Sequence, residues 1–385
     1  MNRIEKLIEE LCPDGVEFKE LGGVSKINTG NSNANESEID GEFPFFVRSK
    51  NIKYKNTFEF DEEVIIIPGE GGVGDIFHYY KGKFSLHQRA YKINILLEEV
   101  NPKFIYYYLV SNFKKYILVN AVDATVLSIR KPMIEKFKIP IPPLQIQEEI
   151  VKILDKFTQL EAELEAELEA RKLQYEYYLN KLLTVNPEIE LNSLGETCDI
   201  KRGRFSPRPR NNPIYYGGKI PFVQTGDISR AKTYVHSFSQ TLNDKGLSVS
   251  KLFPKGTILM TIAANIGDIA ILSFDAACPD SLVAFIPNKN INNKWLYYIL
   301  GTLKHKFLSI SDGSAQKNLS LEKIKPISIS IPPLINQEKI VNVLDQFDTL
   351  VNDITIGLPA EIAARRQQYE YYRNQLLTFK PYESK

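Results

Sequence analysis

The sequence has few of the residues that build metal sites and disulfide frameworks. Its 385 residues include three cysteines and four histidines. Cys12, Cys198 and Cys278 lie far apart and form no Cys-x-x-Cys pair, so neither a zinc site nor a disulfide framework is predicted. The histidines are equally scattered, and we interpret them as structural.

Long apolar runs are also missing. The longest aliphatic run is Val64–Ile67, whereas a membrane-spanning helix needs about 20 apolar residues. The charged start of the chain leads into no apolar signal core. The sequence therefore predicts no membrane association and a cytoplasmic location. With 48 basic and 47 acidic residues the net charge is +1, so any binding of nucleic acid depends on local charge.

Motifs that resemble catalytic signatures fail in their context. Gly69–Gly74 matches GxGxxG, but Asp75–Tyr80 has the pattern of a returning strand, so a tight hairpin is predicted. Pro13–Lys19 imitates the PD…ExK pattern of metal-dependent nucleases, with too little chain between its halves, and a turn after the first helix is predicted. Asn101–Phe104 is a poor match to the loop of base methyltransferases. No catalytic residue and no metal site is predicted.

The chain repeats itself. Ile139–Asp155 recurs with many identities as Ile329–Asp345, 190 residues later, and Tyr175–Tyr178 recurs as Tyr369–Tyr372 at an offset of 194. The second copy thus has four extra residues, near Gly357. We divide the chain into two tandem repeats, each a globular part followed by a tail.

Both tails have the pattern of long helices. The first has apolar residues at steps of three and four, which predicts a helix over Gln145–Leu183 with one apolar seam. In the second tail the extra residues, with Gly357 and Pro359, predict a break. Two such helices can pair antiparallel and bury each other's seams, which would relate the repeats by a pseudo-twofold axis.

The globular parts have the pattern of mixed α/β domains with a strand-dominated core. Short β-rich runs such as Val64–Ile67, Ile220–Val223 and Thr257–Ile262 alternate with turn residues. A helix is expected to close each part, over Pro102–Tyr116 and Asn293–Phe307.

The local charge indicates nucleic acid. Between Lys201 and Lys232 there are eight basic residues and one acid, Asp227, a surplus typical of a phosphate-binding surface. A solvated basic loop is the alternative interpretation, but the first repeat also has basic residues in its globular part. The candidate DNA-binding residues are Arg48, Lys50, Lys53, Gln88, Arg89 and Arg130 in the first repeat and Lys201, Arg202, Arg204, Arg208, Arg210, Gln224 and Thr225 in the second.

Several motifs together resemble one family. They are the opening Leu7–Phe18, the twice-used Ile-Pro-Pro-Leu…Gln-Glu and Tyr-Glu-Tyr-Tyr tail motifs, Gly313–Ser320 and Gly357–Ile362. Over essentially its full length the chain resembles the specificity (S) subunit of type I restriction-modification enzymes.

The resemblance implies an α/β (α+β) fold: two strand-rich target-recognition domains separated by two long antiparallel coiled-coil helices, as a pseudo-twofold tandem repeat. It implies a non-catalytic subunit that recognises DNA, each domain reading one half of a bipartite asymmetric site while the helices set the spacing. The expected segments are a first recognition domain with an N-terminal helix at 1–140, a helical spacer at 141–186, a second recognition domain at 187–330 and a helical spacer at 331–385.

The expected partners are double-stranded DNA, two methyltransferase (modification) subunits and the restriction/translocase subunits. No cofactor is expected on this chain, because S-adenosylmethionine, ATP and Mg would be bound by the partner subunits. The resemblance adds DNA contacts at Gln316, Lys317 and Asn318, which the first repeat lacks at the matching Asp123–Ser128. It also implies partner contacts on the tails, at Tyr175, Tyr178, Tyr369 and Tyr372.

Two other classes stay open from the residues alone. A coiled-coil scaffold with two protein-binding heads would bind no DNA, so salt-dependent binding to duplex DNA separates it from the first interpretation. A self-sufficient methyltransferase or nuclease would need catalytic motifs that the sequence does not contain, and binding of S-adenosylmethionine by this chain alone would support it.

Overall fold

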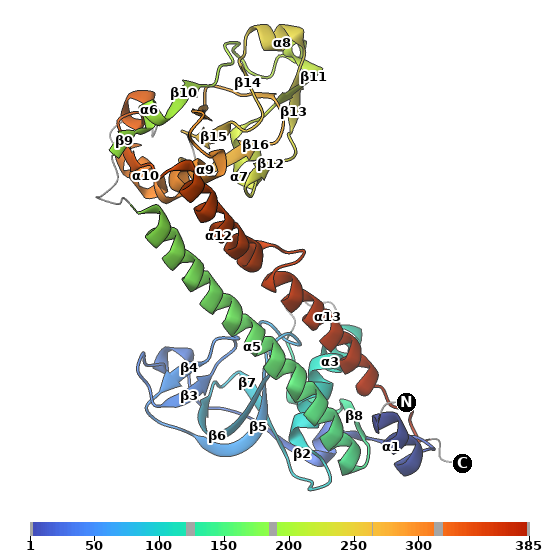
Figure 1. Ribbon diagram of the computed structural model, residues 1–385. Helices are drawn as coiled ribbons and strands as arrows, with labels where there is room; N and C mark the ends of the chain where they lie inside the picture. The colour runs from blue at the N-terminus through green and yellow to red at the C-terminus, as the bar shows by residue number, and fades with distance from the viewer. Residues whose placement is uncertain (1–2, 121–127, 185–190, 264, 312–318, 383–385) are drawn as a thin grey trace. The chain divides into compact units, whose positions relative to one another are not determined.

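The chain folds as two compact units that each draw on both repeats. The computed structural model (Figure 1) describes residues 3–120, 128–184, 191–263, 265–311 and 319–382. Unit 1 combines Met1–Glu165 with Glu361–Lys385, and unit 2 is Ala166–Ala360. The boundaries predicted at 140, 186 and 330 divide the chain by sequence, and they stay a prediction.

Unit 1 is built on a six-stranded sheet in the order β2-β7-β5-β6-β3-β4, in which β3 and β6 are parallel and the other neighbours antiparallel. The run Val64–Ile67 is fully buried because both faces of its strand, β5, are covered: Ile65 and Ile67 pack in one hydrophobic cluster, and Val64 and Ile66 pack in another. The strands are β2 (Ser25–Thr29), β3 (Phe43–Phe46), β4 (Lys53–Lys55), β5 (Phe60–Pro68), β6 (His78–Leu86) and β7 (Ala90–Ile95). Helix α3 (Pro102–Asn120) adds Phe104 and Phe113 to the core of unit 1.

Unit 2 divides its strands between a five-stranded sheet, β10-β18-β15-β16-β12, and a four-stranded sheet, β13-β11-β17-β14. The three predicted β-rich runs fall in β5, β11 and β15, which confirms a strand-dominated core in both units. The strands are β10 (Cys198–Arg202), β11 (Tyr216–Phe222), β12 (Tyr234–Val235), β13 (Gln240–Leu242), β14 (Leu252–Phe253), β15 (Ile258–Thr261), β16 (Ile269–Leu272), β17 (Ala276–Ala277) and β18 (Leu282–Pro287).

Each unit also has a two-stranded ribbon and short helices. In unit 1, β1 (Glu17–Glu20) pairs with β8 (Lys138–Ile141), and in unit 2, β9 (Leu191–Ser193) pairs with β19 (Ser328–Ser330). The N-terminal helix α1 (Arg3–Leu11) ends before the turn that leads into β1, as predicted. The other short elements are α2 (Leu21–Val24), η1 (Ala34–Glu36), α4 (Lys131–Glu135), α6 (Leu194–Thr197), η2 (Pro213–Tyr215), α7 (Thr225–Arg230), α8 (Asp244–Ser248) and α11 (Leu321–Ile324).

The glycine-rich segment after β5 connects two antiparallel strands, as predicted, but the loop Gly69–Phe77 is longer than the predicted tight hairpin. β5 and β6 are antiparallel neighbours, and Gly74 has a φ of +79°, which glycine adopts without strain. The next residue, Asp75, forms an ion pair of 2.6 Å with Lys114 of α3. The matching Gly267 in unit 2 also has a positive φ, +88°, and Asp268 pairs with Lys304 at 2.7 Å. The repeated Gly-Asp-Ile motif therefore holds a turn to a helix.

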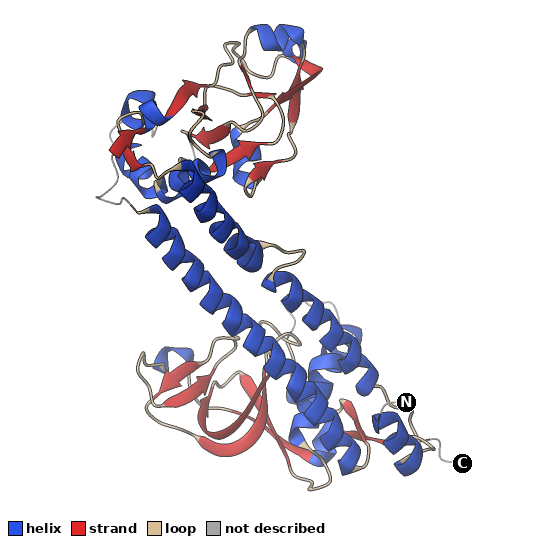
Figure 2. Cartoon of the chain, in the orientation of Figure 1, coloured by secondary structure: helices blue, strands red, loops and turns tan. Residues whose placement is uncertain are grey.

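The tails are helices that pair antiparallel within each unit. α5 spans Leu144–Leu183, and the second tail is α12 (Leu334–Asn352) and α13 (Leu358–Leu376), separated by the predicted break. In unit 1, Phe157 stacks on Tyr372, while Arg366 pairs with Glu161. Residues further along α5 meet residues earlier along α13, which defines the antiparallel direction. Figure 2 shows that strands are confined to the globular parts.

A matched set of polar contacts joins each globular part to the start of its tail. The side chains of Gln147 and Gln337 are fully buried. Each accepts a backbone N–H, from Asn101 and Asn292 respectively, at 2.8 Å, and donates to two backbone carbonyls. Buried amides of this kind need their partners, because an unsatisfied polar group costs about 1–3 kcal/mol.

A second set of contacts joins the globular part to the tail about two helical turns further along. Asp155 accepts from the Lys103 ammonium at 2.8 Å and from the Tyr107 hydroxyl at 2.6 Å. Asp345 accepts from Lys294 at 2.7 Å and from Tyr298 at 2.6 Å. Burial, strengthened by the hydrogen bond to the carboxylate, raises the pKa of both tyrosines. The two joints therefore have the same chemistry in both repeats.

One predicted helix is wrong in its extent. In place of one helix over Asn293–Phe307, the structure has α9 (Asn293–Thr302) and α10 (Lys304–Ser311). Between them Leu303 leaves the helical region, with ψ at 0°, shortly after Gly301, a poor helix former. Within the described part of the chain, no helix combines the length and the apolar character needed to cross a bilayer.

Candidate nucleic-acid interface

In unit 1 the candidate residues gather around Glu70, in the turn after β5. The Glu70 carboxylate accepts from the guanidiniums of Arg48, which follows β3, and Arg89, at 2.7 Å for the latter. The hydrogen bond and charge of Arg89, aided by Arg48, hold the pKa of Glu70 below its ordinary value. Backbone bridges link this turn to the segment at Ser128, which brings Arg130, exposed at the start of α4, toward it.

Two further candidates of unit 1 hold the loop after β2. Gln88 donates its side-chain amide to Asn33 at 2.6 Å, and Lys53 donates to the Ala34 carbonyl at 3.1 Å and to Ser37 at 3.3 Å. Lys50 is exposed in the loop after β3. The structure therefore places Lys53, Gln88, Arg89 and Arg48 in one connected surface region.

His87, which directly precedes Gln88 and Arg89, belongs to the same region and was not predicted as a DNA contact. His87 Nδ1 accepts the backbone N–H of Arg89 at 2.9 Å. Burial, with the charges of Arg48 and Arg89, lowers the pKa of His87. The imidazole is therefore neutral at neutral pH, and the positive charge of this surface comes from arginine and lysine.

In unit 2 the arginines of the basic segment converge on Asp280, in the turn between β17 and β18. The Asp280 carboxylate accepts from Arg208 at 3.0 Å and from Arg210, and its backbone carbonyl accepts from Arg202 at 2.6 Å. Three of the five predicted basic residues therefore form one cluster. The acid of this cluster, Asp280, lies outside the basic segment Lys201–Lys232 in which the charges were counted.

The other candidates of unit 2 have separate partners. Arg204 donates twice to the Ser250 carbonyl, at 3.1 and 2.7 Å, and so connects two loops, while Lys201 pairs with Asp199. Gln224 precedes α7 and donates to Gln240. Thr225 is the first residue of α7 and is half-buried. Gln316, Lys317 and Asn318 lie outside the described residues.

Asp227, the one acid in the basic segment, pairs with Arg230 and does not face the arginine cluster. Its side chain is 1% exposed and caps α7 by accepting the Gln224 backbone N–H at 2.9 Å. It also accepts from Ser239 and pairs with Arg230. Asp227 therefore neutralises Arg230 and stabilises a helix, while Asp280 is the acid that faces the arginine cluster.

Asp280 has a structural counterpart in unit 1, which is Gln88 and not Glu70. β7 pairs with β2 as β18 pairs with β10, with Ser25 opposite Ile95 and Cys198 opposite Pro287. Counting back seven residues from Ile95 and from Pro287 leads to Gln88 and Asp280. Both residues lie in the same turn, and both hold the loop that follows the first strand of the sheet.

The tail tyrosines predicted to bind partners have contacts inside the chain. Tyr175 and Tyr178 stack on Phe347 at centroid distances of 6.2 and 5.3 Å, and Tyr369 and Tyr372 lie against Phe157 at 6.2 and 5.6 Å. Burial raises the pKa of Tyr369 to about 12 and raises that of Tyr175 as well. Their role toward a partner stays a prediction.

The tyrosines that directly precede Tyr178 and Tyr372 point outward. Tyr177 is 57% exposed and Tyr371 is 61% exposed. They occupy the same position in the two copies of the Tyr-Glu-Tyr-Tyr motif. Each stacks edge-on against the following tyrosine at 5.4 Å. The third residue of the motif is therefore the most exposed tyrosine of the motif in both tails.

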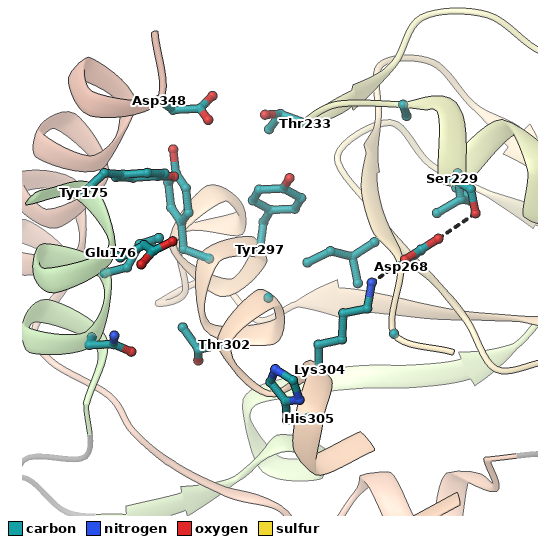
Figure 3. A pocket seen from close by; sticks show the side chains of 18 residues that line it. Tyr175, Glu176, Ser229, Thr233, Asp268, Tyr297, Thr302, Lys304, His305 and Asp348 are labelled. Carbon is teal, nitrogen blue, oxygen red and sulfur yellow. Dashed lines mark hydrogen bonds and ion pairs between the residues drawn. The ribbon is translucent and has the colours of Figure 1, made fainter. Parts of the chain in front are cut away.

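A cavity of about 680 Å³ lies in unit 2, lined by residues of α5, α7, α9 and α10. Figure 3 shows Asp268 held between Lys304 and Ser229, which donates at 2.6 Å. Burial opposes ionisation of Asp268, but the hydrogen bonds from Lys304 and Ser229 outweigh it and lower the pKa of this carboxyl. Tyr175 and Tyr297 line the cavity on the helical side. The ion pair of Asp268 with Lys304 holds the turn at Gly267 to α10, and we assign no chemical role to the cavity.

No group of three His, Cys, Asp or Glu side chains among the described residues could hold a metal ion. Glu70 and Asp280 are the residues that sequence reasoning missed. Glu70 was hidden in the glycine-rich segment, and the partners of Asp280 lie 70 and 72 residues earlier in the chain. The signal that could have identified Asp280 is its alignment with Gln88.

The fold and the two basic clusters define a protein made of two tandem repeats. Each repeat has a globular part, called the head from here on, and a helical tail. Comparison with known proteins gives the family. The type I restriction modification DNA specificity domain matches the chain twice, over residues 13–170 and 186–364. The chain therefore belongs to this family.

Its relatives include a putative type I restriction enzyme specificity subunit of Haemophilus influenzae, 32% identical over 98% of both chains. A type I restriction enzyme specificity subunit of Escherichia coli is 37% identical over 63% of each chain. The fold is similar to the crystal structure of a type I restriction-modification S subunit from M. genitalium, with a TM-score of 0.59 and 16% identity over 94% of this chain and 96% of that one. The predicted fold class and the predicted non-catalytic specificity class are confirmed.

Proposed function

We propose that this chain is the DNA sequence-recognition subunit of a type I restriction-modification complex, in which each head reads one half of a bipartite, asymmetric duplex site. The observation that carries the proposal is the duplicated head, in which each copy has two arginines held by one carboxylate, Glu70 in unit 1 and Asp280 in unit 2. Arginine binds phosphates and guanine edges through paired N–H donors. Because the loops of the two heads differ in sequence, the two half-sites should differ.

We assign the tails two roles in this proposal. α5 has 40 residues, which corresponds to about 60 Å at ~1.5 Å per residue, long enough to set the spacing between half-sites. Tyr177 and Tyr371 are equivalent outward-facing aromatic residues, and two equivalent surfaces suit two copies of one partner. We assign these surfaces to two methyltransferase (modification) subunits, with restriction/translocase subunits joining the complex through them.

The chemistry of the complex would belong to those partners. S-adenosylmethionine would supply the methyl group, and ATP and Mg would serve translocation and cleavage, all bound outside this chain. The part of this chain is to bind duplex DNA and to orient it. A coiled-coil scaffold without DNA is the weaker alternative, because an exposed arginine cluster in each head has no purpose in it.

Two measurements test the proposal. The chain is produced with its modification subunits, and the methylated positions in the host genome are sequenced. We expect a bipartite asymmetric motif, and exchange of residues 190–325 for those of another family member should change one half of it and leave the other intact. Binding of the complex to duplex DNA should weaken steeply with salt. No modified motif and no salt-dependent binding would refute DNA recognition.

Tyr177→Ala and Tyr371→Ala test the docking surfaces. Each should lower the number of modification subunits that copurify with the chain, because exposed aromatic residues dominate such interfaces. Leu173→Ala is the control, since Leu173 is a similarly exposed apolar residue on α5, at 68%, outside the repeated motif. Copurification unchanged by both tyrosine substitutions would move the docking surface elsewhere.

A further inference from the structure

Each unit contains one carboxylate that bridges two arginines. In unit 1, Glu70 holds Arg48 and Arg89. In unit 2, Asp280 holds Arg208 and Arg210. The same arrangement is therefore built twice.

The two carboxylates are not the same position of the repeat. Asp280 corresponds to Gln88, which binds Asn33 by its amide, whereas Glu70 lies in the turn after β5. The arrangement was thus not simply copied with the repeat. Two different solutions to one geometry favour a functional role over inheritance.

These pairs add little to the stability of the fold. The side chains are between 30% and 61% exposed, and exposed ion pairs contribute little to stability. Each guanidinium has five N–H donors in a planar fork, and each arginine of these pairs uses only some of them on protein acceptors. The remaining donors can bind a second acceptor from solution.

A carboxylate that bridges two guanidiniums has the charge sign and the oxygen geometry of a DNA phosphate. It keeps the two arginines spread and oriented, and it reduces the local charge from two positive charges to one. A random duplex offers phosphates to displace it, but its base edges do not match the groups of the protein. A target duplex also offers matching base edges, which compensate for the lost internal bonds.

We propose that Glu70 and Asp280 are internal substitutes for phosphate, which occupy the arginine pairs in the free protein and so weaken binding to non-target DNA. This inference rests on the proposed function. The hydrogen bond from Arg89, which holds the pKa of Glu70 low, keeps that carboxylate charged at neutral pH. Target DNA replaces the carboxylates at both pairs, whereas non-target DNA competes with them.

The test compares Glu70→Gln and Asp280→Asn in the full chain produced with its modification subunits. The probes are a duplex of about 40 base pairs that contains the modified motif and a duplex of random sequence. We expect binding to the random duplex to tighten about two- to tenfold per substitution at low salt, given the small energy of exposed pairs, and its salt dependence to steepen by about one unit per new phosphate contact. The ratio of target to random affinity should fall.

Matched controls remove one carboxylate of the same unit elsewhere. Glu135→Gln in unit 1 loses a pair with Lys131 at 3.6 Å, and Asp244→Asn in unit 2 loses an exposed acid of α8. Asp280→Ser is a second substitution, and thermal unfolding checks that each variant is folded.

The outcomes separate the two proposals. Tighter binding of random DNA by both test variants and by neither control supports the inference. Equal tightening in the controls would show a net-charge effect and overturn it. Weaker binding of both duplexes would also overturn it, because the carboxylates would then serve DNA contact directly. If the unsubstituted complex binds no duplex in a salt-dependent manner, the proposed function itself fails.

Discussion

Phe157 of α5 stacks on Tyr372 of α13, with ring centroids 5.6 Å apart and ring planes at 28°. The equivalent contact in unit 2 is Phe347 on Tyr178, at 5.3 Å and 27°. In both, the phenylalanine lies early in one tail and the tyrosine late in the other. Each compact unit is thus completed by the tail of the other repeat, which explains why both tails retain the same motifs while the heads differ.

Phe157→Ala should destabilise unit 1. The side chain is half-buried and stacks on two tyrosines, so we expect a loss of about 1–3 kcal/mol. Denaturant unfolding followed by circular dichroism measures it. The control is Leu173→Ala, an exposed position of the same helix, where a change within about 0.5 kcal/mol is expected. Equal losses at both positions would mean that the aromatic stack adds nothing to the pairing of the helices.

Tyr298→Phe should weaken the joint between head and tail in unit 2. The hydroxyl donates to Asp345 at 2.6 Å, and a hydrogen bond to a charged group is worth about 1.5–3 kcal/mol, reduced here because the carboxylate is partly exposed. We expect a loss of roughly 1 kcal/mol in the free energy of unfolding. Tyr177→Phe, which removes an exposed hydroxyl, is the control. In a double-mutant cycle with Asp345→Asn, additive effects would contradict a direct bond.

Arg204→Ala and Arg202→Ala should behave differently although both residues belong to the basic segment. Arg204 connects two loops through the Ser250 carbonyl, so its loss should lower the melting temperature. Arg202, Arg208 and Arg210 form the surface cluster, and their combined replacement should weaken DNA binding and reduce the salt slope by about 0.9 per lost phosphate contact. An unchanged slope in the triple variant would place the DNA elsewhere.

The sequence predicts the tails well because their signal is local. The predicted helix Gln145–Leu183 differs from α5 by one residue, since apolar spacing of three and four is a property of neighbouring residues. The family was evident from motifs that are likewise contiguous.

The arginine clusters were predicted only in part, because ion pairs form across the fold. Counting charge between Lys201 and Lys232 finds the arginines but omits Asp280, which the sheet brings to them from the turn after β17. The helix predicted over Asn293–Phe307 is instead two helices, α9 and α10, because Leu303 leaves the helical region shortly after Gly301.

The three thiols should differ in reactivity, and this depends on pH. Burial raises the pKa of Cys12, which is half-buried, above its usual value of 9.0. Burial raises the pKa of Cys198 to about 12 and that of Cys278 as well. Because the thiolate is the nucleophile, a raised pKa lowers reactivity below that pKa.

Alkylation by iodoacetamide, followed by mass spectrometry, tests this order. In the native protein only Cys12 should react at about pH 8, with a rate that rises about tenfold per pH unit up to about pH 9, as the thiolate fraction does. All three should react in denaturant. Native labelling of Cys278 at the rate of Cys12 would show that the core of unit 2 opens readily.

The last prediction concerns the length of α5. Inserting Leu-Glu-Ala-Glu after Leu168 adds about 6 Å and rotates the remainder of the helix by about 40° beyond a full turn. The insertion lies between the stack at Phe157 and the stack at Tyr178, so both stacks keep their own neighbours. A companion insertion of four flexible residues between α12 and α13, where the second tail is already interrupted, lets that tail lengthen too.

If the helices set the spacing, the methylated motif keeps both half-sites and gains about one to two unspecified base pairs, at ~3.4 Å per base pair. A single inserted residue rotates the seam by about 100° and should abolish assembly, because the apolar faces no longer meet. The companion insertion alone is the control and should leave the motif unchanged. Sequencing of the modified sites decides the matter, since an unchanged spacer in the fully active double-insertion variant means that another part of the complex measures the distance.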